Sequence, residues 1–439
     1  MTPNTTSAHA EAPARPQPTT AQREWQRWGL GVFLHVGVNT FADVEWSDGT
    51  LAASSFDPAD LDARVWLRDA AAAGARYVVL TAKHHDGFCL WPTATTDYSV
   101  ASSPWRDGRG DLVREVADAA AAEGIGFGVY LSPWDRHERS YADPAAYDDF
   151  YVRQLTELCS GYGDLAEIWL DGAGSKGRVY DWDRYMAVID ELQPNAMVFN
   201  MGRPSIRWAG NEDGIVDEPV RYAVDSTADS QYTESSTALA AQVYLPPECD
   251  VSIRRGWFHS PSDEPKTPEH LLAIWYRSVG RGANLLLNVP PTPSGGLDAA
   301  DVAALGAFAA ERERRFGAPV VGTLSGGFEP GVVHVALPHP VAVRHVDLVE
   351  RLDDGQRIGR HEVRVDGRVV ASGSSVGARR IHLVDLVETD AIDIWLDDGE
   401  LESVAVHTGD RTMTVPDLPE GYEAPTLTPD ELAALKAAG

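Results

Sequence analysis

The sequence predicts an α/β fold, a TIM-like (β/α) barrel followed by a C-terminal antiparallel β-sandwich. First, apolar runs of strand length alternate with helical patterns up to residue 316, which is typical of a parallel sheet covered by helices. Second, four of the first five apolar runs end in polar or aromatic clusters, as strands do at one face of a barrel. Third, beyond about residue 320 short runs alternate apolar and polar residues between turns, which is typical of a sandwich.

The first barrel unit illustrates how the elements are assigned. Residues 29–37 are predicted to form a strand, because a buried parallel strand is almost continuously hydrophobic. A helix is expected from about Pro58 to Ala73, with Asp57 as its N-cap and Gly74 as a left-handed C-cap. The same reasoning predicts strands at 76–83, 125–131, 168–170, 196–200 and 283–290, and helices at 110–123, 144–161, 182–192, 267–279 and 299–316.

The pattern also predicts the domain organisation. Residues 203–265 lack the alternation and are expected to be rich in loops, whereas period-two runs at 332–337, 341–349, 361–367 and 391–396 mark sandwich strands. The predicted domains are a disordered leader over 1–20, rich in Ala, Pro and Thr, a barrel over 21–318, a sandwich over 319–412 and a tail over 413–439 with a possible short helix from Pro429.

Composition and charge exclude several classes of function. A formal charge of −29 over 439 residues argues against nucleic acid and anionic membrane surfaces as partners and suggests a neutral substrate. No apolar run approaches 18 residues, so no membrane span is predicted. Cys89, Cys159 and Cys249 are widely spaced, which predicts neither disulfides nor a zinc site. The first residues lack a secretory pattern, so we expect a cytoplasmic protein; the oligomeric state is left open.

The polar clusters at the strand ends are the candidate functional residues. They are His35, the run His84-His85-Asp86, the run Trp134-Asp135-Arg136, and Asp171 in Ile-Trp-Leu-Asp-Gly. Buried polar groups need partners, and a sugar supplies them, with hydroxyls for the polar side chains and C–H faces for aromatic rings. Thirteen tryptophans are present, and several lie beside these clusters, namely Trp46, Trp134, Trp169, Trp208 and Trp257.

Two carboxylates could carry the chemistry. Asp171 either acts as a nucleophile or base, or merely caps the turn that follows it. Glu212 either acts as a catalytic acid or is a solvated loop charge, with Asp213, Glu248 and Asp250 as rivals for the acid. The adjacent His84 and His85 suggest a metal, but neighbouring residues on a strand point to opposite faces, so hydrogen bonding to substrate is favoured over a metal-dependent hydrolase.

The combined motifs identify the chain as similar to glycoside hydrolase family 29, the retaining α-L-fucosidases, over about residues 22–410. The resemblance is carried by the segments Gly31–His35, Glu45-Trp46, Lys83–Phe88, Ile168–Gly172, Trp208–Gly214, Pro246–Phe258 and Ser278–Pro291. The Lys-His-His-Asp-Gly-Phe run is highly specific. The Gly-Asn-Glu-Asp-Gly loop, the segment from Asp250 to Phe258 and the stretch from Gly355 to Ile358 resemble the branch that acts on α-1,3/1,4-fucosyl linkages in branched glycans.

The resemblance implies roles for particular residues. Asp171 would be the nucleophile and Glu212 the general acid/base, with no metal and no organic cofactor. Trp134 or Tyr130 would supply the aromatic residue after the third strand, and the other implied ligands of the fucosyl ring are His35, Glu45, Trp46, His84, His85, Trp169 and Trp257.

The expected function is therefore release of α-1,3/1,4-linked L-fucose from fucosylated oligosaccharides through a covalent fucosyl-Asp intermediate. The alternatives are a broad-specificity α-L-fucosidase of the same family and a non-catalytic fucose-binding protein. Burial of Glu212 against Trp208 is expected to raise its pKa so that it starts the reaction protonated. The natural glycan, and whether the sandwich binds carbohydrate or braces the barrel, are left open.

Overall fold

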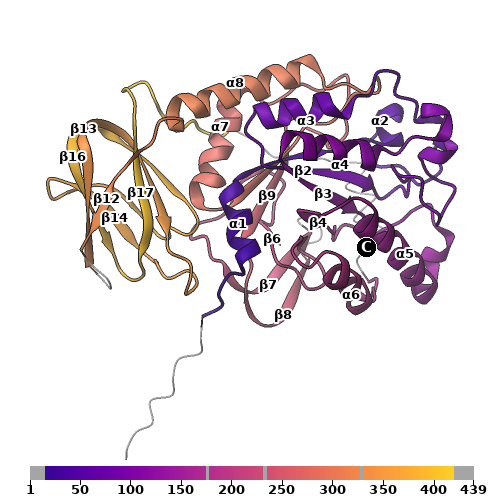
Figure 1. The fold of residues 1–439 in the computed structure, drawn as a ribbon, viewed down its shortest axis with the longest axis horizontal. Helices are drawn as coiled ribbons and strands as arrows, with labels where there is room; N and C mark the ends of the chain where they lie inside the picture. Colours follow the sequence, from indigo (N-terminus) through magenta and orange to yellow (C-terminus); the bar gives the residue numbers. More distant parts are fainter. Residues whose placement is uncertain (1–14, 175–176, 231–234, 327–330, 420–439) are drawn as a thin grey trace, which may run out of the picture.

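A computed structural model of the chain describes residues 15–174, 177–230, 235–326 and 331–419. It contains a parallel barrel and, beside it, an antiparallel sheet built from the C-terminal part of the chain (Figure 1). The fold class predicted from the sequence is confirmed. Most of the predicted leader and the predicted helix from Pro429 lie outside the described residues.

Eight parallel strands form the barrel in the order β5-β4-β3-β2-β1-β10-β9-β6. The two ends of this order approach each other through a parallel bridge between Phe199 and Ile206, so the barrel is nearly closed. The strands are β1 (Leu30–Leu34), β2 (Tyr77–Lys83), β3 (Gly126–Leu131), β4 (Glu167–Trp169), β5 (Met197–Phe199), β6 (Arg207–Trp208), β9 (Pro247–Ser252) and β10 (Asn284–Asn288).

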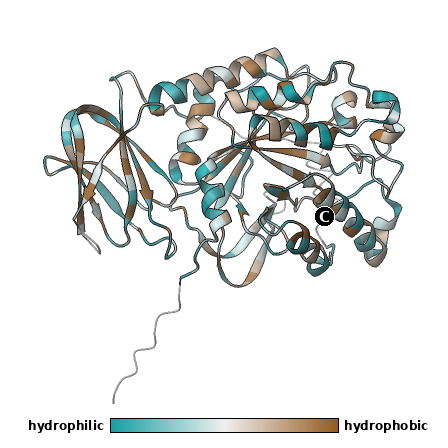
Figure 2. Cartoon of the chain, in the orientation of Figure 1, coloured by the Kyte–Doolittle hydropathy of each residue, from teal (hydrophilic) through white to brown (hydrophobic). Residues whose placement is uncertain are grey.

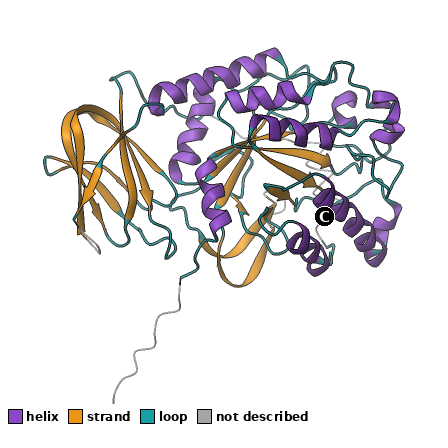
Figure 3. Cartoon of the chain, in the orientation of Figure 1, coloured by secondary structure: helices purple, strands orange, loops and turns teal. Residues whose placement is uncertain are grey.

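Helices cover the outside of the barrel (Figure 3). The first predicted helix begins later than expected: it starts at Ala63, and Asp62 rather than Asp57 is its N-cap, accepting the N–H of Arg64. Gly74 has φ +85°, as expected for the residue that ends this helix. The helices are α1 (Thr20–Trp28), α2 (Val38–Ala42), α3 (Ala63–Ala72), α4 (Leu112–Glu123), α5 (Pro144–Gly161), α6 (Trp182–Leu192), α7 (Pro268–Arg277) and α8 (Ala299–Phe316).

The segment predicted to be rich in loops, 203–265, contains two barrel strands and a hairpin. Strand β9 is buried at every position although it carries Glu248 and Asp250, and these charged residues concealed it in the sequence. Strands β7 (Ala223–Ser230) and β8 (Ser235–Tyr244) form a separate two-stranded antiparallel sheet at the edge of the barrel (Figure 1). The prediction of loops was therefore wrong where these four strands lie, which is about two fifths of this segment.

The C-terminal sheet has seven antiparallel strands in the order β11-β17-β13-β16-β14-β15, with β12 paired to β13. Strands β13 and β16 are long and carry register shifts, which allow strands to bend between layers. The bounds are β11 (Val320–Val321), β12 (Thr323–Ser325), β13 (Gly331–Glu350), β14 (His361–Val365), β15 (Arg368–Gly373), β16 (Arg380–Leu396) and β17 (Leu401–Thr408).

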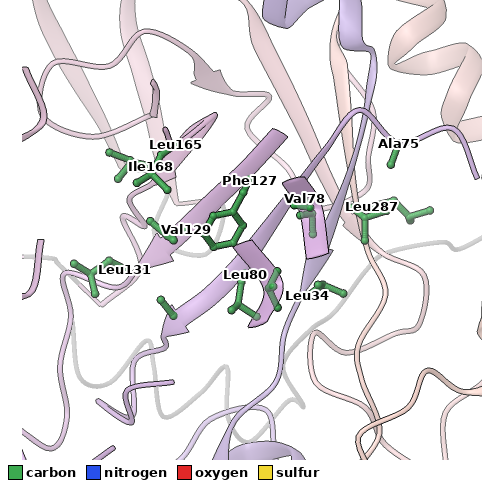
Figure 4. Close-up of a cluster of buried hydrophobic side chains, with 14 of the residues drawn as sticks. Leu34, Ala75, Val78, Leu80, Phe127, Val129, Leu131, Leu165, Ile168 and Leu287 are labelled. Atoms are coloured by element: carbon green, nitrogen blue, oxygen red, sulfur yellow. The ribbon is translucent and has the colours of Figure 1, made fainter. Parts of the chain in front are cut away.

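The barrel and the sheet each have their own hydrophobic core. Hydrophilic and hydrophobic residues are interspersed along the helices that cover the barrel (Figure 2). Side chains such as Val78, Phe127 and Ile168 pack between the strands and the covering helices (Figure 4). A polar contact also joins the two domains: the Tyr222 hydroxyl, which donates to Gly282 O at 2.7 Å within the barrel, accepts the N–H of Ala378 in the C-terminal domain at 2.8 Å. None of the helices in the described part of the chain has the length and apolar character needed to cross a bilayer.

Candidate active site

A pocket that is open to solvent lies at the carboxyl ends of the barrel strands. In a (β/α) barrel this is the face that carries catalytic residues, because the loops after the strands converge there. The lining residues are Phe33, His35, Trp46, His84, His85, Tyr130, Trp169, Asp171, Gly172, Ala173, Phe199, Asn200, Trp208, Glu212, Asp229, Asp250 and Trp257.

Asp171 follows strand β4 and lines the pocket with both carboxylate oxygens held. The Tyr130 hydroxyl donates to Asp171 Oδ2 at 2.8 Å, and the backbone N–H of Ala173 donates to Oδ1 at 2.8 Å. Two donors on one carboxylate fix the direction in which the group faces. Asp171 therefore stands as an oriented, partly exposed carboxylate in the pocket wall.

His85, after strand β2, is positioned by a short chain of hydrogen bonds. Ser132 Oγ donates to the carbonyl oxygen of Trp134 at 2.7 Å, so the same oxygen accepts from His85 Nδ1, also at 2.7 Å. Burial lowers the pKa of His85 to about 4, against the opposing charge of Asp171, so the ring is neutral. Its Nε2, 3.6 Å from Asp171 Oδ2, is therefore an acceptor.

His35, after strand β1, is arranged in the same way. Asn288 uses its Nδ2 to donate to the carbonyl oxygen of Trp257, so its Oδ1 accepts from His35 Nδ1 at 2.9 Å. Burial lowers the pKa of His35 to about 3 and that of His84 well below its ordinary value. A neutral imidazole that donates from Nδ1 has an accepting Nε2, so these rings suit hydroxyl donors such as those of a sugar.

Glu45 does not line the pocket but holds part of its wall. Its carboxylate accepts the backbone N–H groups of Trp257 and Phe258. A Cβ on Gly256 would lie 2.6 Å from Glu45 Oε1, so only glycine permits this approach. Glu45 therefore fixes the segment that presents the Trp257 ring to the pocket.

Aromatic rings supply the apolar part of the site. Trp169 stacks on Phe199 with ring centroids 3.9 Å apart and lies 5.3 Å from Tyr130. Of the two candidates for the aromatic residue after the third strand, Tyr130 lines the pocket, whereas Trp134 packs against Trp46 and His85 with ring centroids 5.4 and 5.0 Å apart. Trp134 thus contacts two residues of the pocket wall.

Glu212 reaches the pocket from the loop after β6. In the ring of eight strands β6 lies opposite β2, so Glu212 and the histidines occupy different walls of one pocket. Hairpin β7–β8 lies against the wall on the Glu212 side, where Asn200 Nδ2 donates to the carbonyl oxygen of Ala228 at 2.7 Å and Asp229 contributes to the lining. This wall is the one that would face a leaving group protonated by Glu212.

Glu248, one of the rivals for the acid, lies beneath the pocket rather than in it. Tyr77 donates to its Oε1 at 2.5 Å and Trp169 Nε1 donates to its Oε2 at 3.1 Å. Burial raises the pKa of Glu248 to about 7. Its carboxyl supports the Trp169 ring from below.

Several pocket residues were not predicted from the sequence, namely Phe33, Phe199, Asn200 and Asp229. Phe33 and Phe199 belong to apolar runs and gave no signal beyond strand formation. Asn200 ends the fifth predicted strand, and its position at a strand end was the available signal. Among the described residues, no group of three or more His, Cys, Asp or Glu side chains is arranged to hold a metal ion.

Comparison with known proteins places this geometry in a family. The sequence model of the family described as alpha-L-fucosidase matches residues 40–310. The chain is 38% identical to putative alpha-L-fucosidase 1 of Oryza sativa, over 88% of this chain and 83% of that protein. It is 36% identical to alpha-L-fucosidase 1 of Arabidopsis thaliana, over 90% of this chain and 88% of that protein.

Solved structures agree. A putative alpha-L-fucosidase from Bacteroides ovatus has a TM-score of 0.83 and 37% identity, covering 90% of this chain and 75% of that one. A Ruminococcus gnavus GH29 fucosidase in complex with fucose has a TM-score of 0.78 and 27% identity, covering 92% of this chain and 97% of that one. The chain therefore belongs to the α-L-fucosidase family, glycoside hydrolase family 29, and is a glycoside hydrolase whose substrate is a fucosylated glycan.

Proposed function

We propose that the enzyme is a retaining α-L-fucosidase in which Asp171 is the nucleophile and Glu212 the general acid/base. The observation that carries this proposal is that both carboxyl groups line one pocket at the carboxyl ends of the barrel strands. Tyr130 and Ala173 hold the Asp171 carboxylate, as an attacking group requires. Retaining glycosidases use two such carboxyl groups about 5–5.5 Å apart.

The reaction would proceed in two steps. An Asp171 oxygen bonds to the anomeric carbon while Glu212 gives its proton to the departing glycosidic oxygen, and the bond to the leaving sugar breaks. Glu212, now a carboxylate, then takes a proton from water. The water oxygen bonds to the anomeric carbon, the bond to Asp171 breaks, and fucose is released.

The remaining pocket residues would bind the fucosyl ring. His35 and His85 offer neutral, accepting Nε2 atoms to sugar hydroxyls, and His84 lies beside them with ring centroids 4.2 Å from His85. Trp46, Trp169 and Trp257 would cover the apolar face and the methyl group of the deoxysugar. Glu45 would act through the Trp257 backbone, and Trp134 through Trp46.

We further propose that α-1,3/1,4-linked fucose in branched oligosaccharides is the preferred substrate. The support is the resemblance of the Trp208–Gly214 loop and the Asp250–Phe258 segment to that branch of the family, together with the place of hairpin β7–β8. The hairpin adds Asp229 to the wall on the leaving-group side, where a branched sugar would need extra contacts. A broad-specificity α-L-fucosidase is the alternative.

Two variants test the catalytic roles. Asp171→Ala should lose about 3–5 decades of turnover, and azide should restore part of it by replacing the missing nucleophile. Glu212→Ala should slow a Lewis-type trisaccharide much more than an activated aryl fucoside, because only the poor leaving group needs protonation. Near-normal activity of Asp171→Ala, or equal losses of Glu212→Ala on both substrates, would contradict the assignment.

A panel of substrates tests the linkage. Initial rates should be much higher on Lewis-type trisaccharides than on 2′-fucosyllactose. Because the panel uses the unaltered enzyme, its outcome does not depend on which residues are catalytic. The reverse ranking would contradict the proposed preference and favour the broad-specificity alternative.

A further inference from the structure

A third carboxyl group lines the pocket without a place in the two-step reaction. Asp250 lies on strand β9, where it is in register with Leu286 of β10, and its side chain is only 2% exposed. It lines the same pocket as Asp171 and Glu212. Burying an acidic group at a substrate site is costly, so its retention there needs a reason.

Trp208 connects Asp250 to the loop of the general acid/base. The Trp208 indole Nε1–H donates to Asp250 Oδ1 at 2.6 Å, a short hydrogen bond between buried groups. Glu212 follows Trp208 by four residues in the same loop. The Asp250 side chain thus anchors the start of the loop that carries Glu212.

The charges around Asp250 are almost all negative. Burial, and then the charge of Glu212, raise the pKa of Asp250 well above its ordinary value, and Glu248 on the same strand adds to the effect. Leu286, its partner in register on β10, is apolar. The other titratable groups that line the pocket are Asp229 on the Glu212 side and, on the remaining walls, His35, His84, His85, Tyr130 and Asp171. A neutral, protonated Asp250 avoids adding another negative charge beside Glu212.

We propose that Asp250 is a positioning residue for the general acid/base: through Trp208 it anchors the loop that carries Glu212, and its second carboxyl oxygen stabilises the Glu212 carboxylate that forms when the leaving group departs. This inference rests on the proposed role of Glu212. Trp208 occupies Oδ1, so Oδ2 carries the proton. The proton count of Asp250 does not change in either step: Glu212 alone gives a proton to the glycosidic oxygen and regains one from water.

The role predicts that an amide can replace the carboxyl and an alkyl group cannot. Asp250→Asn keeps a neutral group with one acceptor and one donor, so kcat/KM on a Lewis-type trisaccharide should stay within about threefold of the unaltered enzyme. Asp250→Leu removes the group that donates to the ionised Glu212 carboxylate, so kcat/KM on the trisaccharide should fall by about tenfold or more. An activated aryl fucoside should be spared in both variants, because its leaving group needs no proton.

The pH profile separates this role from a merely structural one. In Asp250→Leu the alkaline limb of kcat/KM should move up by about one pH unit, because the Glu212 carboxylate has lost its stabilising neighbour. Asp250→Asn should restore the limb to its original place. Asp148→Leu is the matched control: it removes a buried carboxyl on helix α5 that accepts the Tyr185 hydroxyl, and should leave the limb unmoved.

Three outcomes would overturn the inference. Equal kcat/KM losses in Asp250→Asn and Asp250→Leu would show that the ionised carboxyl is needed, and an unmoved alkaline limb in Asp250→Leu would show that the residue does not act on Glu212. If Glu212→Ala keeps its kcat/KM on the trisaccharide while Asp250→Asn loses kcat/KM on that substrate alone, Asp250 is the acid. That result would overturn the proposed function as well. If Asp250→Leu does not fold, Trp208→Phe removes the same hydrogen bond, and the predicted alkaline shift should appear there in smaller measure.

Discussion

Replacing Tyr130 with phenylalanine tests whether the orientation of Asp171 matters for turnover. The Tyr130 ring is buried and stacks near His84 and Trp169, so phenylalanine fills the same space. The only group removed is the hydroxyl that donates to Asp171 Oδ2 at 2.8 Å. Ala173 still holds Oδ1, so the carboxylate keeps one of its two donors.

The size of the effect follows from the kind of hydrogen bond. A bond to a charged partner is worth about 1.5–3 kcal/mol, which corresponds to about one to two decades in rate if it is needed at the transition state. Without the hydroxyl, the accepting Nε2 of His85 faces Asp171 Oδ2 with no donor between them, and the carboxylate is free to turn away. We therefore expect kcat/KM to fall by about 10- to 100-fold.

The loss should be the same on a Lewis-type trisaccharide and on an activated aryl fucoside, because both need the nucleophile. Tyr151→Phe is the control: the buried Tyr151 hydroxyl donates to Leu131 O at 2.7 Å, outside the pocket. That variant should lose about 1 kcal/mol of stability and keep its kcat/KM. A Tyr130→Phe enzyme within twofold of the unaltered one on both substrates would refute the argument.

Two further predictions concern the supporting structure. Gly256→Ala should weaken fucose binding measured by calorimetry, because its Cβ would displace the Glu45 carboxylate that holds Trp257; unchanged affinity would contradict this. Burial raises the pKa of Glu350 to about 7, so the folded protein binds this proton more tightly than the unfolded chain does. The free energy of unfolding should therefore fall as the pH rises from about 4.5 to 7, by up to about 3 kcal/mol. Glu350→Gln should lack that part of the slope in denaturant titrations across this range.

The barrel could be predicted from the sequence where local signals and packing agree. Helices α5 and α6 have the predicted bounds, because each combines an amphipathic pattern with an aspartate N-cap. The first strands are continuous apolar runs and were found for the same reason. The N-cap of α3 was misplaced because Asp57 and Asp62 both precede suitable residues, and only packing decides between them.

The Glu212 side of the pocket could not be predicted in this way. Strand β9 contains Glu248 and Asp250, whose burial is possible only because Tyr77, Trp169 and Trp208 donate to them from other strands. Such partners are far apart in the sequence and leave no periodic signal. Hairpin β7–β8 is mostly exposed along its strands, so it lacks the apolar alternation that marks a half-buried strand.

In the proposed mechanism, carboxyl groups of similar intrinsic acidity take different roles because their surroundings differ. Asp171 is partly exposed and accepts from two donors, which suits a group that must face the anomeric carbon in a fixed direction. Asp250 is buried beside a like charge, which suits a group that must remain protonated. Glu212 is half-buried on the loop after β6, where in the proposed reaction its proton leaves and returns within one cycle. The proposed roles therefore follow from how deeply each carboxyl group is buried and from how many hydrogen-bond donors it has. Exchanging the environments of Asp171 and Asp250 should abolish turnover even though every carboxyl group is kept.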